Sequence, residues 1–291
     1  MPSTVDEWIT LMDLEQTGEG EFTGAGTFSQ RPSVFGGQVL AQALGAAYRT
    51  VEPNRNAHSL SAYFLRPGYP RTPITYRVEA VRDGVSFSFR RVSAHQGDRV
   101  LFSSYASFHV NEPGLTHADQ APTGVPQPDD CPPLSEVLGA RSRRDADGWQ
   151  EEFGAVDVRF AGDTSVLSGQ PAKDAAMKVW IRSASVLPGD PRIHQAFLAY
   201  ASDLTLLAVS TVPHPVVFGA PGMQTVSINH AMWFHRPARA DQWLLYDEVS
   251  PSASMGLGFG FGRIFSGGQL AASCAQEGLI RITDMAELTL S

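Results

Sequence analysis

Alternation of apolar and polar residues dominates two long stretches of the chain, residues 74–110 and residues 243–282. A period of two is typical of strands that bury one face. Asp83-Gly84 interrupts the first stretch and Gly267-Gly268 the second, and both pairs are turn signals of antiparallel hairpins. The pattern therefore predicts two groups of antiparallel strands.

A helical stretch that is apolar nearly all round precedes each group of strands, over residues 35–51 and residues 193–209. Such a helix is usually buried, and an antiparallel sheet that wraps around it satisfies both elements. The expected fold class is therefore α+β. The second helical stretch contains one acid, Asp203, among leucines and a phenylalanine. A buried and unpaired carboxylate is costly, so Asp203 is either a helix cap, an exposed residue or a working group.

The two groups of strands belong to an internal repeat. Residues 63–67 (YFLRP) are echoed by residues 233–237 (WFHRP), so that the Arg-Pro pairs stand 170 positions apart. Further along, Ser103 and Ser273 show the same offset. A constant offset across separated segments indicates duplication.

A proline-rich tract separates the repeats. We expect an N-terminal domain over residues 1–112, a linker over residues 113–150 and a C-terminal domain over residues 151–291. Residues 156–160 and 178–185 are predicted to be the opening strands of the second repeat. Glycines alternate in "GLGFGFG" (256–262), and we interpret them as allowing close backbone approach rather than dinucleotide binding, because no strand–turn–helix context follows.

Composition narrows the possible partners. The 291 residues carry a net charge of -8, which argues against nucleic acid. Cys131 and Cys274 form neither a metal spacing nor a disulfide framework, so no metal or other cofactor is expected. The N-terminus has no signal-peptide pattern, and no apolar run reaches membrane-spanning length. We therefore expect a cytoplasmic protein that is not bound to a membrane.

Five motifs together resemble acyl-CoA thioesterase II, the TesB-type family: "FGGQVLAQAL" (35–44), "HSLSAYFLRPG" (58–68), "YASDLTLL" (200–207), "SINHAMWFHRP" (227–237) and "AQEGLIR" (275–281). The resemblance extends from about residue 12 to about residue 285. It implies a double hotdog fold, in which two tandem repeats each wrap an antiparallel sheet around a helix. It also implies hydrolysis of acyl-CoA to a free fatty acid and CoA.

The resemblance places a catalytic trio in the second hotdog, consisting of an Asp, a Thr or Ser, and a Gln. Carried over by motif, these residues are Asp203, Ser227 and Gln276. Ser227 stands where many members of the family have Thr, and Asn229 where some have Asp.

The repeat provides an independent argument for the same residues. At the offset of 170, Ala57 corresponds to Ser227 and Ala106 corresponds to Gln276, and the first helical stretch contains no acid. Structural demands are similar in both copies, so polar groups found in only one copy are better explained by chemistry. We expect Asp203 to activate a water molecule that Ser227 and Gln276 help to position, without an acyl-enzyme.

Several alternatives remain at this stage. Asp203 resembles the N-cap of a second helix, and His58 is another candidate base. His230 and His235 are five residues apart and should lie on opposite faces of a strand, which disfavours a metal site. The alternative functions are a hotdog enoyl-CoA hydratase and a non-hydrolytic acyl-CoA binding protein. A homodimer or homotetramer is expected.

Overall fold

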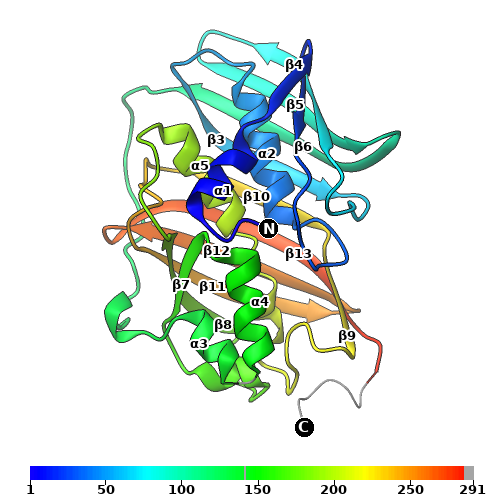
Figure 1. The fold of residues 1–291 in the computed structure, drawn as a ribbon. Coiled ribbons are helices and arrows are strands. Elements are labelled where there is room, and N and C mark those ends of the chain that lie inside the picture. The colour runs from blue at the N-terminus through cyan, green and yellow to red at the C-terminus, as the bar shows by residue number, and fades with distance from the viewer. Residues whose placement is uncertain (141, 285–291) are drawn as a thin grey trace.

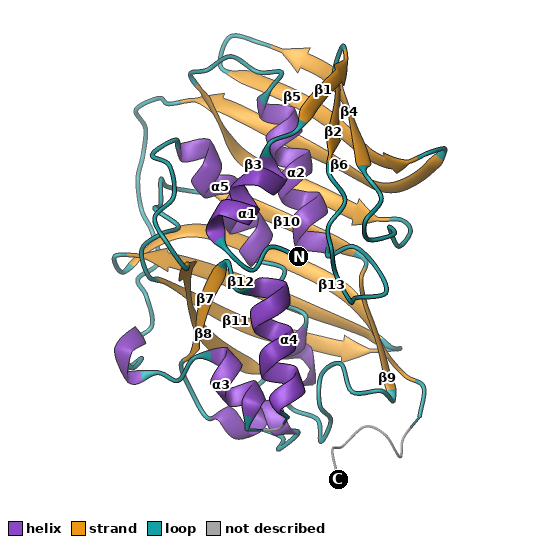
Figure 2. Ribbon diagram, in the orientation of Figure 1, coloured by secondary structure: helices purple, strands orange, loops and turns teal. Residues whose placement is uncertain are grey.

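In a computed structural model of the protein, residues 1–140 and 142–284 are described, and they form one antiparallel sheet of 13 strands (Figures 1 and 2). The strands of the N-terminal half are β1 (Glu15–Gly18), β2 (Glu21–Gly24), β3 (Arg55–Phe64), β4 (Ile74–Asp83), β5 (Phe87–Gln96) and β6 (Arg99–Val110). Those of the C-terminal half are β7 (Val156–Phe160), β8 (Ala176–Ser183), β9 (Met223–Ser227), β10 (Asn229–Phe234), β11 (Leu244–Ser254), β12 (Leu257–Ser266) and β13 (Gln269–Ile282).

The two halves of the sheet meet at one pair of strands. The order is β1-β2-β4-β5-β6-β3 in the first half and β10-β13-β12-β11-β8-β7 in the second, with β9 paired to β13. Strand β3 pairs with β10 across the junction, and Ser61 lies opposite Ala231. These two residues are equivalent in the repeat, so an approximate two-fold axis passes between them.

The matched arginines confirm this symmetry. Arg66 donates to the carbonyl of Val100, and Arg236 donates in the same way to the carbonyl of Leu270. The residue pairs again differ by 170 positions, so both arginines hold the chain just after the central strand.

Helix α2 (Gly36–Tyr48) is buried along nearly its whole length and packs on the N-terminal half of the sheet. Helix α5 (Pro191–Ala201) packs against α2 at the centre of the molecule (Figure 1). Helix α1 (Val5–Met12) covers this pair, with the Trp8 ring edge-on to Phe197. The predicted helix-and-sheet layout of each half, and with it the α+β fold class, is confirmed.

The predicted extent of the second helix is wrong, because α5 ends at Ala201 instead of continuing to residue 209. A turn follows, and then the 3₁₀ helix η3 (Ala208–Thr211) lies on β11 and β12. The turn lies so close to the sheet that a Cβ atom on Gly260 would be 2.5 Å from the carbonyl oxygen of Leu206. The glycines of β12 therefore serve the close approach that the sequence predicted.

The tract predicted as a linker is partly helical. It contains α3 (Leu134–Gly139) and most of α4 (Arg143–Phe153), which lie over the C-terminal half of the sheet (Figure 2). Residue 141 and residues 285–291 of the predicted segments lie outside the described residues. The predicted domain bounds and the predicted homo-oligomer stay predictions.

Candidate active site

Asp203 lies in the turn after α5 with only 9% of its surface exposed. Its Oδ1 atom accepts a hydrogen bond from the hydroxyl of Ser227 at 3.2 Å and another from the side-chain amide of Gln276. The same amide nitrogen of Gln276 donates to the Ser227 hydroxyl at 2.8 Å. The structure thus brings together all three residues that the sequence selected.

Three separate elements provide these side chains. Ser227 ends β9, Gln276 lies within β13, and the two strands are neighbours that pair Ser227 with Gly278. A Cβ atom on Gly278 would collide with Leu207, so this glycine lets the turn that carries Asp203 settle on the strands. The position of the carboxylate therefore depends on glycines that lie far from it in the sequence.

Burial raises the pKa of Asp203 to about 6. The hydrogen bonds from Gln276 and Ser227 oppose this effect, as does the backbone N–H of Gly37, because they stabilise the charged form. Such a carboxylate is ionised at neutral pH and is a stronger base than an exposed one.

The N-terminus of α2 points at this carboxylate. A Cβ atom on Gly36 would lie 2.7 Å from Oδ2 of Asp203, so only glycine fits there. No side chain caps the start of α2. Helix α5, in contrast, is capped by Asp190, whose carboxylate accepts from the backbone N–H of Arg192 at 2.9 Å. The start of α2 therefore has no cap from its own N-cap residue, and the N–H of Gly37 bonds to Asp203 instead, whereas α5 is capped by its own Asp190.

The site opens into a cavity of about 530 Å³, which we call the site cavity. Asp203, Ser227 and Gly36 line it, together with Arg31 and Arg66. The Arg31 guanidinium stacks over the Phe153 ring at 5.5 Å and helps to hold the pKa of Asp203 down. The cavity therefore combines a carboxylate, a helix N-terminus and positive charge.

The other candidates have local partners. His58 and the Ser107 hydroxyl are 2.8 Å apart, and His58 does not line the site cavity. His230 is fully buried against the Ser202 hydroxyl at 3.0 Å, and burial lowers its pKa to about 4. His235 pairs instead with Ser273. No cluster of metal-ligating side chains occurs among the described residues.

The interpretation of Asp203 as a cap of its own segment is wrong. The N-cap of η3 is Leu207, and the carboxylate of Asp203 is bonded to Ser227 and Gln276. The backbone N–H that reaches it belongs to Gly37 of the other repeat.

One feature of the site and one of the protein core escaped the sequence analysis. One is the glycine pair that opens α2, for which the signal was Gly36-Gly37 directly before a buried helix. The other is Glu248, a fully buried acid on β11 that accepts from the Thr205 hydroxyl at 2.5 Å. Its signal was an acid at an inward position of a strand.

Comparison with known proteins agrees with this geometry. The acyl-CoA thioesterase family matches residues 151–279, and its N-terminal domain matches residues 25–109. The chain is 35% identical to acyl-CoA thioesterase 2 of Haemophilus influenzae over 290 residues, which cover 98% of this chain and all of that protein. The chain belongs to the acyl-CoA thioesterase family. The predicted resemblance to the TesB type and the predicted thioester hydrolase activity are thereby confirmed.

Two further relatives extend the comparison. Human acyl-coenzyme A thioesterase 8 is 35% identical over 289 residues, which cover 94% of this chain and 88% of that protein. The solved structure of acyl-CoA thioesterase II TesB2 from Mycobacterium marinum is 40% identical, with a TM-score of 0.79 over 96% of this chain and 98% of the other. The double hotdog is therefore the fold of this family member, and hydrolysis is favoured over the hydratase and binding-protein alternatives. No helix among residues 1–140 and 142–284 has the length and apolarity needed to cross a membrane.

Proposed function

We propose that this thioesterase hydrolyses acyl-CoA with Asp203 as the general base for a water molecule, while Ser227 and Gln276 orient the carboxylate. The observation that carries the proposal is the shared hydrogen bonding of Oδ1. Ser227 and Gln276 both donate to that oxygen, and Oδ2 lies on the side of Gly36 at the site cavity. Fixing one oxygen directs the other, which is the kind of positioning that lowers a reaction barrier.

The N-terminus of α2 is the proposed oxyanion site. Backbone N–H groups in the first turn of a helix favour negative charge, and removal of one such donor typically costs about 3 kcal/mol of transition-state stabilisation. Gly36 lines the site cavity beside Asp203, and the N-cap residue of α2 makes no side-chain bond to the helix start. The N–H of Gly37 is bonded to Asp203, so the proposal assigns the oxyanion to the neighbouring N–H groups of the first turn. A thioester carbonyl placed there would have its oxygen toward these N–H groups and its carbon toward the water held by Asp203.

The proposed reaction has two steps. Asp203 takes one proton from water as the water oxygen bonds to the thioester carbon, and the carbonyl oxygen becomes the oxyanion. The intermediate then collapses, the carbon–sulfur bond breaks, and the proton on Asp203 passes to the sulfur of CoA. The products are the carboxylic acid and the CoA thiol, and the carboxylate of Asp203 is restored.

We favour a direct attack by water over an acyl-enzyme because we assign Ser227 and Gln276 to holding the carboxylate of Asp203, and neither cysteine offers a nucleophile. The thiol of Cys274 is fully buried, and burial raises its pKa to about 12, far from the thiolate form that attacks carbonyls. Cys131 is also buried and lines no part of the site cavity.

The test compares Asp203→Asn with His58→Gln on a panel of short-, medium- and long-chain acyl-CoAs, with CoA release followed by a thiol reagent. Asn keeps the shape of Asp but is not a base, so we expect kcat to fall at least about a hundredfold. His58→Gln should leave kcat unchanged. Thermal unfolding checks that each variant is folded. If folded Asp203→Asn were as active as the wild type, the proposed role of Asp203 would be refuted.

A further inference from the structure

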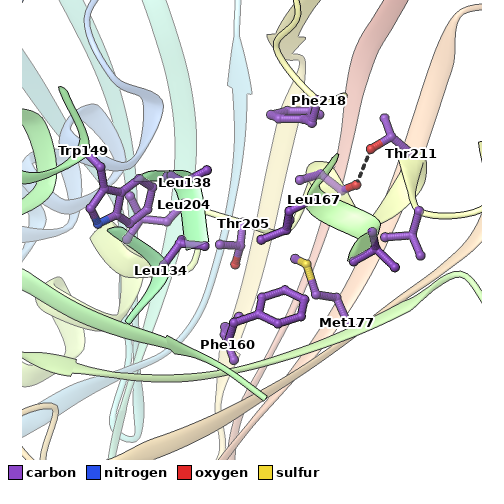
Figure 3. Close-up of a pocket in the computed structure, with 14 residues that line it drawn as sticks. Leu134, Leu138, Trp149, Phe160, Leu167, Met177, Leu204, Thr205, Thr211 and Phe218 are labelled. Atoms are coloured by element: carbon purple, nitrogen blue, oxygen red, sulfur yellow. Dashed lines mark hydrogen bonds between the residues drawn. The ribbon is translucent and has the colours of Figure 1, made fainter. Parts of the chain in front are cut away.

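A second cavity lies beside the site cavity, and nothing in the proposed mechanism uses it. It has a volume of about 100 Å³ and lies between α3 and α4 on one side and strands β7 and β8 on the other (Figure 3). Leu134, Leu138 and Trp149 line it from the helices, and Phe160 and Met177 line it from the strands. We call it the tail pocket.

The tail pocket is mostly apolar. Its lining side chains carry only three polar groups, which are the hydroxyls of Thr205 and Thr211 and the indole N–H of Trp149. The hydroxyl of Thr205 donates to Glu248 at 2.5 Å, and that of Thr211 donates to the carbonyl of Ala208 at 2.8 Å (Figure 3 shows the second bond). Both hydroxyl protons are therefore already used, so the pocket suits hydrocarbon rather than a hydroxylated or charged group.

The tail pocket and the site cavity share part of their lining. Trp149, Leu204, Ala208 and Phe218 contribute to both. Leu204 directly follows Asp203 in the chain, so the shared boundary begins next to the carboxylate. In Figure 3, Phe160 and Met177 lie at the opposite side of the pocket from Phe218.

We propose that the acyl chain of the substrate runs from Asp203 past Leu204 and ends in the tail pocket, where Met177 and Phe160 form the end wall. This inference rests on the proposed function, because that function places the thioester at Asp203. The helices of the proline-rich tract would then form one side of the acyl-binding site.

The volume of the tail pocket limits how many carbons of the acyl chain it can hold. A cavity of about 150 Å³ accommodates benzene, with its six carbons, so about 100 Å³ accommodates about four carbons. A longer tail would have to displace the end wall. Met177 is 4% exposed and pairs across the strands with Glu248, while Val179 beside it is fully buried, so the wall has little room to yield.

Met177→Ala is the variant that lengthens the tail pocket. It removes three heavy atoms from the end wall, and we expect the preferred acyl chain to lengthen by about two carbons. Ala208→Leu adds bulk at the shared boundary and should shift the preference to shorter chains. Met232→Ala is the matched control, because Met232 is fully buried but lines neither cavity.

The measurement is kcat/KM for saturated acyl-CoAs of increasing length, on the full chain of each variant, with thermal unfolding to confirm folding. A longer optimum in Met177→Ala, with the wild-type optimum retained in Met232→Ala, supports the assignment. The same optimum in wild type and Met177→Ala would overturn it, as would an equal shift in Met232→Ala. Failure of the proposed function is a separate result, because it would show as activity that survives in Asp203→Asn.

Discussion

The backbone N–H of Ala57 donates a hydrogen bond to the hydroxyl of Tyr48 at 2.7 Å, at the position where the second repeat has Ser227. The Gln195 side chain joins this contact, since its amide donates to the carbonyl of Ala57 at 2.9 Å and its oxygen accepts from Tyr48. Arg192 covers the Tyr48 ring at 5.1 Å. The place equivalent to the candidate active site is therefore filled with side chains in the first repeat, which leaves one candidate site of this kind among residues 1–140 and 142–284.

Two of the three glycines of α2, Gly36 and Gly45, allow a matched test of the helix N-terminus. In Gly36→Ala, the new Cβ would lie 2.7 Å from Asp203 Oδ2 and 3.0 Å from the Phe64 ring. We expect kcat/KM to fall at least tenfold, because the carboxylate must move. In Gly45→Ala the new Cβ meets only the terminal methyl of Met12, at 3.3 Å.

Gly45→Ala should keep wild-type activity and raise the free energy of unfolding by up to about 1 kcal/mol, because alanine favours the helix interior. Steady-state kinetics and chemical unfolding of both variants give the comparison. Wild-type activity in Gly36→Ala would show that the start of α2 takes no part in the reaction.

Ser227 should tolerate replacement by Thr but not by Ala. Threonine keeps the hydroxyl that donates to Asp203 and accepts from Gln276, whereas alanine leaves both partners with one bond fewer. A lost hydrogen bond to a charged group costs about 1.5–3 kcal/mol, so we expect kcat to fall about tenfold to a hundredfold in Ser227→Ala. Equal kcat in the Ala and Thr variants would argue that the hydroxyl has no role.

Activity should depend on the ionisation of Asp203. The base works only when deprotonated, and burial raises the pKa of Asp203 to about 6, so kcat/KM should rise with pH and level off above about pH 7. Ser227→Ala removes a hydrogen bond that lowers this pKa, so the rise should move to higher pH. A pH–rate profile of both proteins measures the shift, and an unchanged profile from pH 5 to pH 8 would contradict the assignment.

Glu248 should make the stability of the protein depend on pH. Burial raises the pKa of Glu248 to about 8, and the bond from Thr205 opposes that effect only in part. Because the folded pKa exceeds the unfolded one, the stability that protonated Glu248 contributes is complete below about pH 4.5 and is lost as the pH rises through about 8. The loss attributable to Glu248 between pH 7 and pH 8 is about 1 kcal/mol.

Glu248→Gln is the matched variant, because glutamine has nearly the same shape and stays neutral. Its oxygen can still accept from Thr205. We expect the free energy of unfolding to decline less between pH 7 and pH 8 in the variant than in the wild type, as measured by denaturant titration. In this range Asp203 is ionised in both folded and unfolded states, so it contributes little to the slope. If the free energy of unfolding declined equally with pH in Glu248→Gln and in the wild type, Glu248 would already be ionised in the folded protein.

Much of the fold could be predicted because the sequence contains the same pattern of helix and strands in two repeats. The offset of 170 indicates the duplication, and the structure shows its consequences: Ser61 pairs with Ala231, and Arg66 and Arg236 make equivalent hydrogen bonds. The same comparison singled out Ser227 and Gln276, because the first repeat has alanine at both positions. Local alternation and a constant spacing are properties of the sequence, so they needed no knowledge of packing.

The remaining features depend on contacts between distant segments. The turn at Asp203 replaces a predicted helix because Gly260 and Gly278 let residues 202–207 lie directly on the sheet. The helices α3 and α4 follow a run of prolines, whose composition indicated a linker. Neither apolar periodicity nor secondary-structure propensity indicates which part of the protein a segment will pack against.

The axis between Ser61 and Ala231 makes the single chain a fused pair. In a dimer of two identical hotdog subunits, any substitution at one site would also be present at the equivalent site of the other subunit. Covalent fusion removes that constraint, since each copy can change alone. One copy has kept Asp203, Ser227 and Gln276 together, while Tyr48 and Gln195 close the place of the other. In the proposed mechanism the two halves therefore have different tasks: the C-terminal half carries the reacting residues, and the N-terminal half contributes the start of α2 at Gly36.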